Sequence, residues 1–340
     1  MSLKKLVWRL TPPLTHRLIR DVHFVLKLLP NYAYDFRRFL LYSGINKSRG
    51  LAGEHAAQVV LAYHQIEKGL SYAEPRPGFG KEVVERLLRA MGRFVALHGW
   101  VAPATVALRV LYEYVAFNEA AGLDMTALRA RLAELAGSAE QAQAMAECAS
   151  GGALPVRRSE LEARRVEGFA DFFASRHSVR QFAGGAVTPA DVAAAVAIAQ
   201  KTPSVCNRQA WRVHAFQPSD QMQQLMAIQG GSRGFGERAG ALLVVTCDLA
   251  CFVEAGERYQ AWIDGGMFSM SLCLAFHSMG FGTCCLAWSK ERQADKALRT
   301  AMPLPVGEQV IMFMAVGTLP ESFNVAVSTR RALGDMLTFH

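Results

Sequence analysis

The feature that most constrains the fold is an uncharged run near the C-terminal end. Residues 265–288 contain no Asp, Glu, Lys or Arg, and a run of this length can cross a bilayer as one helix. Gly280 and Gly282 lie inside it, and glycine disfavours a continuing helix. We therefore expect a helix over 257–279 that is apolar and buried on every side. A core strand follows it, and a transmembrane helix is not expected.

Helices and strands alternate through the second half of the chain. Residues 188–191 supply an N-cap threonine, a proline at the first helical position and a carboxylate in the first turn, so they predict a helix that ends before Pro203. Apolar runs predict strands over 212–217, 241–248, 281–287 and 309–317. No Gly-x-Gly-x-x-Gly follows a strand. This order favours an α+β sandwich around an antiparallel-type central sheet over a doubly wound parallel sheet.

The first 165 residues are predicted to be helical. A helix begins at Pro12–Pro13 and runs to about Leu29, where Pro30 ends it. Further helices are predicted over 31–42, 51–68, 81–98, 102–121, 125–135, 139–149 and 160–174. Residues 150–158 form the best linker candidate. We therefore divide the chain into a helical region over 1–158, an active-site cover or docking module, and a second domain over 159–340.

Composition narrows the class of protein. Hydrophobic residues make up 51% of the chain, so disorder is not expected. The net charge of +8 suits an anionic ligand or partner, although a solvated basic face explains most of it. The seven cysteines form no Cys-x-x-Cys pair and no zinc-like cluster with histidine. We expect buried thiols in a reducing, cytoplasmic compartment, no metal and no secretory signal.

Two polar segments carry the candidate chemistry. Residues 175–182 place two arginines, a histidine and a serine close together, and the guanidinium fork of arginine matches phosphate oxygens. Residues 203–211 supply hydroxyl and amide side chains, which can read the polar edge of a heterocycle. A basic loop at a helix end is the alternative interpretation of the first segment.

Together these segments resemble the two N-terminal signatures of the FMN-dependent nitroreductase family. Residues 264–266 and 280–285 are similar to the central helix of that family and the turn after it. Residues 316–320, with Arg330 and Arg331, are similar to its C-terminal motif. The resemblance covers roughly residues 166–340 and implies a nitroreductase-like fold that binds FMN.

The resemblance also implies roles for individual residues. Arg176 and Ser178 would hold the phosphate and ribityl side of FMN, and His177 would contact it mainly through its backbone. Arg180 would lie near N1 and O2 of the isoalloxazine, where a cation stabilises the negative charge of reduced flavin. Arg330 or Arg331 would clamp the phosphate.

A second group is implied for the flavin ring. The loop that contains Pro203, Ser204, Val205, Asn207 and Gln209 would cross a dimer interface and contact the flavin of the other subunit. Val205 replaces a usual serine, and Ala210 replaces a usual proline. A backbone N–H of Ala287 or Trp288 would face flavin N5, although the family's glycine is absent there, and the Trp288 side chain would cover the ring.

The connection between Asp248 and Asp264 is too short for the helices that roof the substrate pocket in many nitroreductases. The N-terminal half is the spare mass, and residues 64–80 join polar side chains to a Gly/Pro-rich turn. We therefore expect His64 or Arg76 to contact substrate over the open face of the flavin, either in the same chain or from the other subunit. A capped helix followed by a turn is the plainer interpretation.

The leading hypothesis is an FMN-dependent oxidoreductase that transfers electrons from NADH or NADPH to an organic acceptor. We expect a homodimer with FMN at the interface and no nucleic-acid partner. The alternative is a flavin-binding module with little or no turnover, which docks to a polysaccharide-biosynthesis or membrane-associated assembly. The basic, aromatic first 42 residues leave peripheral contact with a membrane open as a third hypothesis.

Overall fold

The computed structural model describes residues 13–45 and 52–340, and it confirms the α+β class. Four strands form one sheet in the order β1-β2-β4-β3, and every neighbouring pair is antiparallel. The strands are β1 (Trp211–Phe216), β2 (Ala241–Asp248), β3 (Phe281–Ala287) and β4 (Glu308–Thr318). Each lies within one residue of its predicted bounds at both ends, because apolar runs flanked by glycine and polar residues mark strands clearly.

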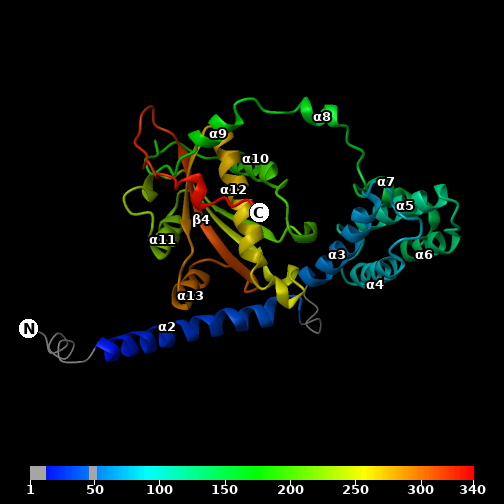
Figure 1. The fold of residues 1–340 in the computed structure, drawn as a ribbon, viewed down its shortest axis with the longest axis horizontal. Helices are drawn as coiled ribbons and strands as arrows, with labels where there is room; N and C mark the ends of the chain where they lie inside the picture. The colour runs from blue at the N-terminus through cyan, green and yellow to red at the C-terminus, as the bar shows by residue number, and fades with distance from the viewer. Residues whose placement is uncertain (1–12, 46–51) are drawn as a thin grey trace, which may run out of the picture.

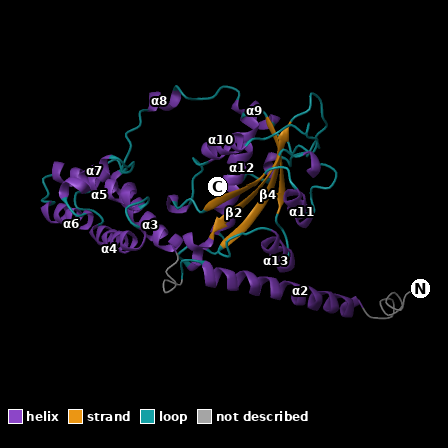
Figure 2. Ribbon diagram, turned by 180° about the vertical axis from the view of Figure 1, so that it is seen from behind, coloured by secondary structure: helices purple, strands orange, loops and turns teal. Residues whose placement is uncertain are grey.

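Helices cover both faces of the sheet, which gives a three-layer sandwich (Figures 1 and 2). Helices α10 (Pro189–Ala199) and α12 (Gln260–Ser278) pack on one face. Helices α11 (Asp220–Gln229) and α13 (Arg292–Ala301), which were not predicted, belong to the opposite face. Thr188 caps α10 through a reciprocal capping box with Asp191, as the local pattern predicted.

Helix α12 is confirmed as the central helix, but it is not buried on every side as predicted. Within one chain it leaves an apolar strip exposed, formed by Trp262, Ile263, Met267 and Met270. Its other side packs on the sheet through Phe268, Leu272 and Phe276, which are fully buried. Exposed apolar side chains grouped on a core helix are unusual for a single chain, so this strip is a candidate contact surface.

Five helices of the N-terminal region form a separate module. They are α3 (Ala52–Leu70), α4 (Lys81–His98), α5 (Ala104–Ala120), α6 (Thr126–Ala136) and α7 (Ala139–Glu147), and they share a hydrophobic core of their own. The module stands beside the sandwich in both views (Figures 1 and 2). Helix α3 approaches the sandwich at its start, where Gly53 lies against Asp248 and Ala250, and it also contacts the loop at Val205–Asn207.

A long connection returns the chain from this module to the sandwich. The single helix predicted over 160–174 is wrong: the structure has α8 (Arg158–Glu162) and α9 (Phe169–Ser175) with a break between them. Gly168 sits in the break with φ of 74°, a left-handed conformation that glycine adopts without a steric penalty. The break sets the direction of α9, which delivers the chain to Arg176.

The N-terminal helix α2 (Pro13–Tyr42) packs on the sandwich rather than on the helical module. Pro30 lies inside it, so the prediction that Pro30 ends a helix is wrong. The Asn31 side chain donates to the carbonyl of Lys27 at 2.8 Å, in the turn that the proline disturbs. Contacts to the sandwich on both sides of Pro30 outweigh the lost backbone hydrogen bond.

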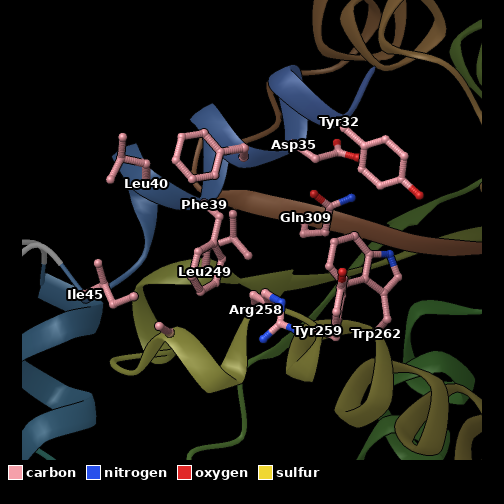
Figure 3. A pocket seen from close by; sticks show the side chains of 12 residues that line it. Tyr32, Asp35, Phe39, Leu40, Ile45, Leu249, Arg258, Tyr259, Trp262 and Gln309 are labelled. Atoms are coloured by element: carbon pink, nitrogen blue, oxygen red, sulfur yellow. The ribbon is translucent and has the colours of Figure 1, made fainter. Parts of the chain in front are cut away.

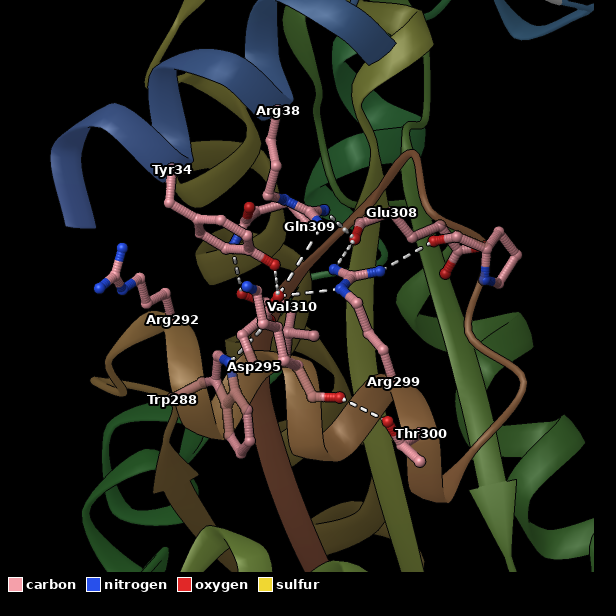
Figure 4. A network of polar contacts seen from close by, with 12 residues as sticks. Tyr34, Arg38, Trp288, Arg292, Asp295, Arg299, Thr300, Glu308, Gln309 and Val310 are labelled. Carbon is pink, nitrogen blue, oxygen red and sulfur yellow. Dashed lines mark hydrogen bonds and ion pairs between the residues drawn. The ribbon is translucent and has the colours of Figure 1, made fainter. Parts of the chain in front are cut away.

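Phe39 and Tyr42 pack on the sandwich core, and the other contacts of α2 are polar (Figure 4). Tyr34 donates to Asp295 of α13 at 2.7 Å, and Arg38 donates to the carbonyl of Glu308 at 2.8 Å. Arg299 donates to Asp295 at 2.8 Å from within α13. Burial opposes ionisation of Asp295, but hydrogen bonds from Arg299 and Tyr34 hold its pKa below the ordinary value. The carboxylate is thus the hub that joins α2 to α13.

Candidate functional site

The first polar segment crosses the ends of two strands. Val179 donates its backbone N–H to the carbonyl of Thr283 at 2.9 Å, and Ala183 does the same to Thr318 at 2.9 Å. Two glycines make this approach possible: a Cβ on Gly282 would lie 3.1 Å from Val179, and one on Gly317 would lie 2.6 Å from Phe182. The glycines of the downstream motifs therefore serve to seat the Arg176–Phe182 segment on β3 and β4.

Arg176 lines a small cavity of about 70 Å³ at the C-terminal end of α12. Its Nε atom is buried and has no hydrogen-bond partner among the described residues. An unpaired buried guanidinium N–H is costly, so such a group usually has a partner in the functional state. The cavity is lined by residues of the 175–182 segment, the end of α12, the start of β3 and the segment after β4, including His177, His277, Thr283, Leu319 and Phe323.

His277 belongs to this site, although sequence reasoning did not single it out. Its Nε2 lies 2.8 Å from the Ser175 hydroxyl, and its ring packs on Phe172 at 4.8 Å. Burial lowers the pKa of His277, and the neighbouring charge of Arg176 lowers it further. A neutral imidazole beside Arg176 leaves the guanidinium as the main positive charge of the cavity. Its position as the one histidine of the uncharged run could have indicated it.

The second polar segment is anchored at the other end of α12. Asp264 is buried and accepts hydrogen bonds from the Val205 backbone N–H at 3.2 Å and from Gln260 at 2.8 Å. Arg208, whose side chain is fully buried, forms a two-pronged ion pair with Glu257 and donates to the carbonyl of Cys251 at 2.7 Å. Asp264 and Arg208 are thus positioning residues that the motif contained but that sequence reasoning did not single out.

This loop holds an unusual backbone conformation. Cys206, Asn207 and Gln209 all have φ between 48° and 54°, in the left-handed region that residues other than glycine rarely adopt. Such strain persists where surrounding contacts enforce it, and it concentrates at binding sites. The strained loop leaves Pro203, Asn207 and Gln209 exposed, while Ser204 and Val205 are half-buried. The Ser204 hydroxyl is engaged locally, since it accepts from the Gln209 backbone N–H at 3.0 Å.

One chain does not bring the two segments together along α12. The loop over 203–209 is tied to Asp264, whereas the Arg176 cavity is tied to His277. These two α12 residues are thirteen positions apart, which at 1.5 Å per residue is about 20 Å along the helix axis.

The other residues that were predicted to contact the flavin lie in several different elements of the domain. Ser178 pairs with Thr283 in an isolated bridge, and Arg180 is exposed. Arg330 and Arg331 are both exposed, and Arg330 donates to the carbonyl of Ser328. Leu319 and Phe323, in the same C-terminal segment, line the Arg176 cavity. Contacts of Arg330 and Arg331 with a phosphate therefore stay a prediction.

Ala287 and Trp288, at the end of β3, lie in different surroundings. Trp288 stacks on Phe313 with ring centroids 5.0 Å apart, and its Nε1 points to Asp295 at 3.4 Å. Its indole therefore packs with the core beneath α11 and α13. Ala287 is exposed, and its carbonyl accepts from Gln229 at 3.0 Å. The predicted role of the backbone N–H of Ala287 or Trp288 stays open, while the Trp288 side chain is occupied in packing.

The predicted roof lies in the helical module. His64 contacts Glu67 at 3.3 Å on one face of α3, and Glu67 also accepts from the Gly152 backbone N–H at 3.3 Å. Arg76 is exposed in a turn that Phe79 fastens against Gly69 and Tyr114. The module stands apart from α9 in both views, so within one chain His64 and Arg76 do not cover the Arg176 cavity (Figures 1 and 2).

The described residues contain neither a metal-ligand cluster nor a membrane-spanning helix. Over residues 13–45 and 52–340, no three His, Cys, Asp or Glu side chains are grouped as metal ligands would be. Over the same ranges, no helix has the length and apolar character that crossing a membrane requires.

A protein-family model matches part of the chain. Residues 173–229 and 221–318 match the model of the Nitroreductase family. Solved structures similar to this chain include an FMN-dependent nitroreductase from Clostridium difficile R20291, with 19% identity and a TM-score of 0.42 over 49% of this chain and 96% of that chain. A nitroreductase family protein from Streptococcus pneumoniae has 16% identity and a TM-score of 0.43, covering 51% of this chain and 100% of that chain.

A nitroreductase-like protein from Streptococcus mutans has 19% identity and a TM-score of 0.44, covering 52% of this chain and 100% of that chain. None of the curated proteins compared matches the chain. The family match falls on the residues that form the sandwich and the Arg176 cavity. The C-terminal half of the chain therefore carries a nitroreductase-family domain.

Proposed function

We propose that the protein is an FMN-dependent oxidoreductase that transfers electrons from NADH or NADPH to an organic acceptor. The observation that supports FMN most strongly is Arg176, whose Nε is buried without a partner in a cavity within the nitroreductase-family domain. A phosphate oxygen would satisfy this donor, and the His177 and Ser178 segment lies on the same strand ends.

FMN, when bound, supplies the hydride and electron transfer. The chain's own residues would bind the flavin, orient it and tune its reduction potential. Arg176 supplies a charge-assisted hydrogen bond to the phosphate, and the neutral His277 keeps a second positive charge out of the cavity. Arg180 is exposed beside β3 and supplies a positive charge near the ring, which favours the reduced, anionic form.

The site is incomplete in one chain, and we propose a homodimer that completes it. The two polar segments are anchored about 20 Å apart along α12, and that helix exposes the apolar strip from Trp262 to Met270. Packing two copies of α12 through this strip, related by a twofold axis, sets the loop over 203–209 of one chain near the Arg176 end of its partner. Two equivalent flavin sites then lie at the interface.

Reduction by a nicotinamide tests the proposed activity. In an anaerobic stopped-flow experiment, NADH or NADPH should bleach the absorbance of the protein-bound flavin in a rapid phase whose rate saturates with nicotinamide concentration. Free FMN under the same conditions is the control. Retained flavin that neither nicotinamide reduces would contradict the enzyme and favour the alternative, a flavin-binding module that docks to a larger assembly.

A second candidate function is docking to a membrane surface, and helix α2 supports it. This helix turns polar side chains toward the sandwich and apolar side chains toward solvent. Its hydrogen bonds and ion pairs to the sandwich come from Lys27, Asn31, Tyr34 and Arg38, and apolar packing comes from Phe39 and Tyr42 at its C-terminal end. The opposite side of the helix carries Val22, Val25, Leu29, Tyr32 and Phe36, which are 49% to 68% exposed. At 3.6 residues per turn these two stripes point in opposite directions. The polar contacts therefore fix the apolar stripe outward.

The apolar surface continues into a groove between α2 and the start of α12 (Figure 3). This groove has a volume of about 400 Å³, and aromatic rings of Tyr32, Phe39, Tyr259 and Trp262 line it. Two exposed arginines accompany the stripe and the groove, namely Arg37 on α2 and Arg258 in the lining of the groove. An apolar stripe flanked by basic residues matches the interfacial zone of an anionic bilayer. We propose that α2 docks there.

Vesicle flotation tests this second function. The protein should float with vesicles that contain phosphatidylglycerol and stay behind with pure phosphatidylcholine vesicles. Leu29→Asp and Phe36→Asp should abolish flotation without unfolding the chain, since both side chains are exposed. Leu97→Asp, at an exposed position on α4, is the matched control and should float normally. Flotation of the α2 variants with the anionic vesicles would contradict membrane docking. Loss of dimerisation in these variants would also contradict it, because the apolar stripe would then belong to the subunit interface.

A further inference from the structure

A pair of cysteines lies beside the Arg176 cavity and has no role in the proposed reaction. Cys273 comes from α12 and Cys285 from β3, and their Sγ atoms are 3.2 Å apart. Cys273 is buried, whereas Cys285 is exposed. The adjacent Cys284 is buried and belongs to the core on the other face of the sheet, so alternation along β3 separates it from Cys273.

We propose that Cys273 and Cys285 form a redox-active dithiol that closes reversibly to a disulfide and thereby changes the charge that faces Arg176. Two thiols in contact, one reachable from solvent and one buried behind it, form the arrangement that thiol–disulfide exchange requires. The bridge would join α12 to β3 directly beneath the cavity.

The exchange balances with a small disulfide such as oxidised glutathione. In the singly ionised pair the shared proton moves to Cys273 across the 3.2 Å contact, so the exposed Cys285 attacks one sulfur of the small disulfide as the thiolate. A mixed disulfide forms, and the first small thiol leaves with the proton taken from Cys273. The Cys273 thiolate then attacks Cys285 Sγ, which breaks the mixed disulfide and releases the second small thiol. Two protein thiol hydrogens leave on the two small thiols, so two electrons pass from the protein to the small disulfide.

The charge of the reduced pair faces Arg176. The two sulfur atoms share one hydrogen bond, and this contact, with the charge of Arg176, holds the pKa of the Cys273 thiol below its ordinary value. Burial and the contact with Cys273 raise the pKa of Cys285, so the pair carries one negative charge when it ionises. That charge competes with an anionic ligand for Arg176. Disulfide formation removes it, and this consequence rests on the proposed flavin site.

Thiol counting by mass spectrometry tests the pair itself and needs no bound flavin. After treatment with oxidised glutathione, the native chain should lose two hydrogens, retain no glutathione and show a Cys273–Cys285 link in peptide fragments. Cys273→Ser should instead trap glutathione on Cys285. Cys148→Ser, at an exposed position in the helical module, is the matched control and should form the link normally. The proposed disulfide would be overturned if Cys273→Ser still lost two thiols on oxidation, or if the native chain kept a stable glutathione adduct.

FMN titration tests the coupling to the site. The oxidised chain should bind FMN about fivefold more tightly than the reduced chain at pH 8, the gain of roughly 1 kcal/mol expected when one competing charge is removed. The double variant Cys273→Ser/Cys285→Ser should show no dependence on oxidant. Equal FMN affinity of the two redox forms would overturn the coupling. Absence of FMN binding in both forms would overturn the proposed flavin site, and the thiol count would still test whether the two cysteines form a disulfide.

Discussion

Replacing Arg176 by alanine should weaken FMN binding by about tenfold to a hundredfold, because a charge-assisted hydrogen bond of this kind is worth roughly 1.5–3 kcal/mol. The side chain is the one whose Nε is buried without a partner, so it gains most from a phosphate oxygen. Quenching of FMN fluorescence on titration with apoprotein measures the effect. Arg176→Lys should recover only part of the affinity, since lysine keeps the charge and loses the fork.

Two further variants locate the rest of the anion site. Arg164→Ala, at an exposed position after α8, should leave FMN affinity unchanged and serves as the matched control. Arg330→Ala combined with Arg331→Ala tests the phosphate clamp of the C-terminal segment and should weaken binding as well. Unaltered affinity in Arg176→Ala would show that the cavity is not the phosphate site.

Asp295→Asn should destabilise the domain by about 3–5 kcal/mol, the usual cost of breaking a buried ion pair from one side. Asp295 is only 8% exposed and faces Arg38, at 8% exposed, and Arg299, at 13%. The neutral amide leaves both guanidinium groups buried without a counter-charge and loses acceptor strength towards Tyr34. Urea unfolding followed by circular dichroism measures the free energy of unfolding. Asp335→Asn, at an exposed position near the C-terminus, should change it by less than about 0.5 kcal/mol.

The same carboxylate sets a dependence on acid. The pKa of Asp295 is lower in the folded chain than in the unfolded chain, so its contribution to stability is complete above the unfolded value, near 4. That contribution is lost as the pH falls through the folded pKa. The stability difference between the native chain and Asp295→Asn should therefore be largest at neutral pH and shrink below about pH 4. A difference that stays constant down to pH 2 would contradict this assignment.

Much of the sandwich could be predicted because its signals are local. β2 and β3 have the predicted bounds, since each is a continuous apolar run between polar or glycine residues. The guanidinium forks in residues 176–182 singled this segment out as a candidate anion site. The structure seats the segment on β3 and β4 with Arg176 lining a cavity, and anion binding there stays a prediction. The glycines at 282 and 317 were recognised as a motif, and the structure supplies the reason, which is the close approach of Val179 and Phe182.

The features that could not be predicted depend on contacts between distant residues. Local rules end a helix at Pro30, but Tyr34 meets Asp295 across 261 positions of sequence, and that contact helps to hold α2 straight through the proline. The break at Gly168 depends on how α9 meets His277 through Phe172. The exposed strip of α12 reflects a surface that one chain leaves uncovered, and an apolar pattern alone does not distinguish burial within a chain from burial between chains.

The central claim is that the nitroreductase-family domain holds FMN at a site completed by a second chain. Native mass spectrometry of the full-length protein, purified with FMN present and exchanged into volatile buffer, tests it most directly. We expect a species of two chains and two FMN molecules, and in Arg176→Ala the same two chains with little or no FMN. A folded chain that carries no FMN, or a monomer that carries one, would contradict the account.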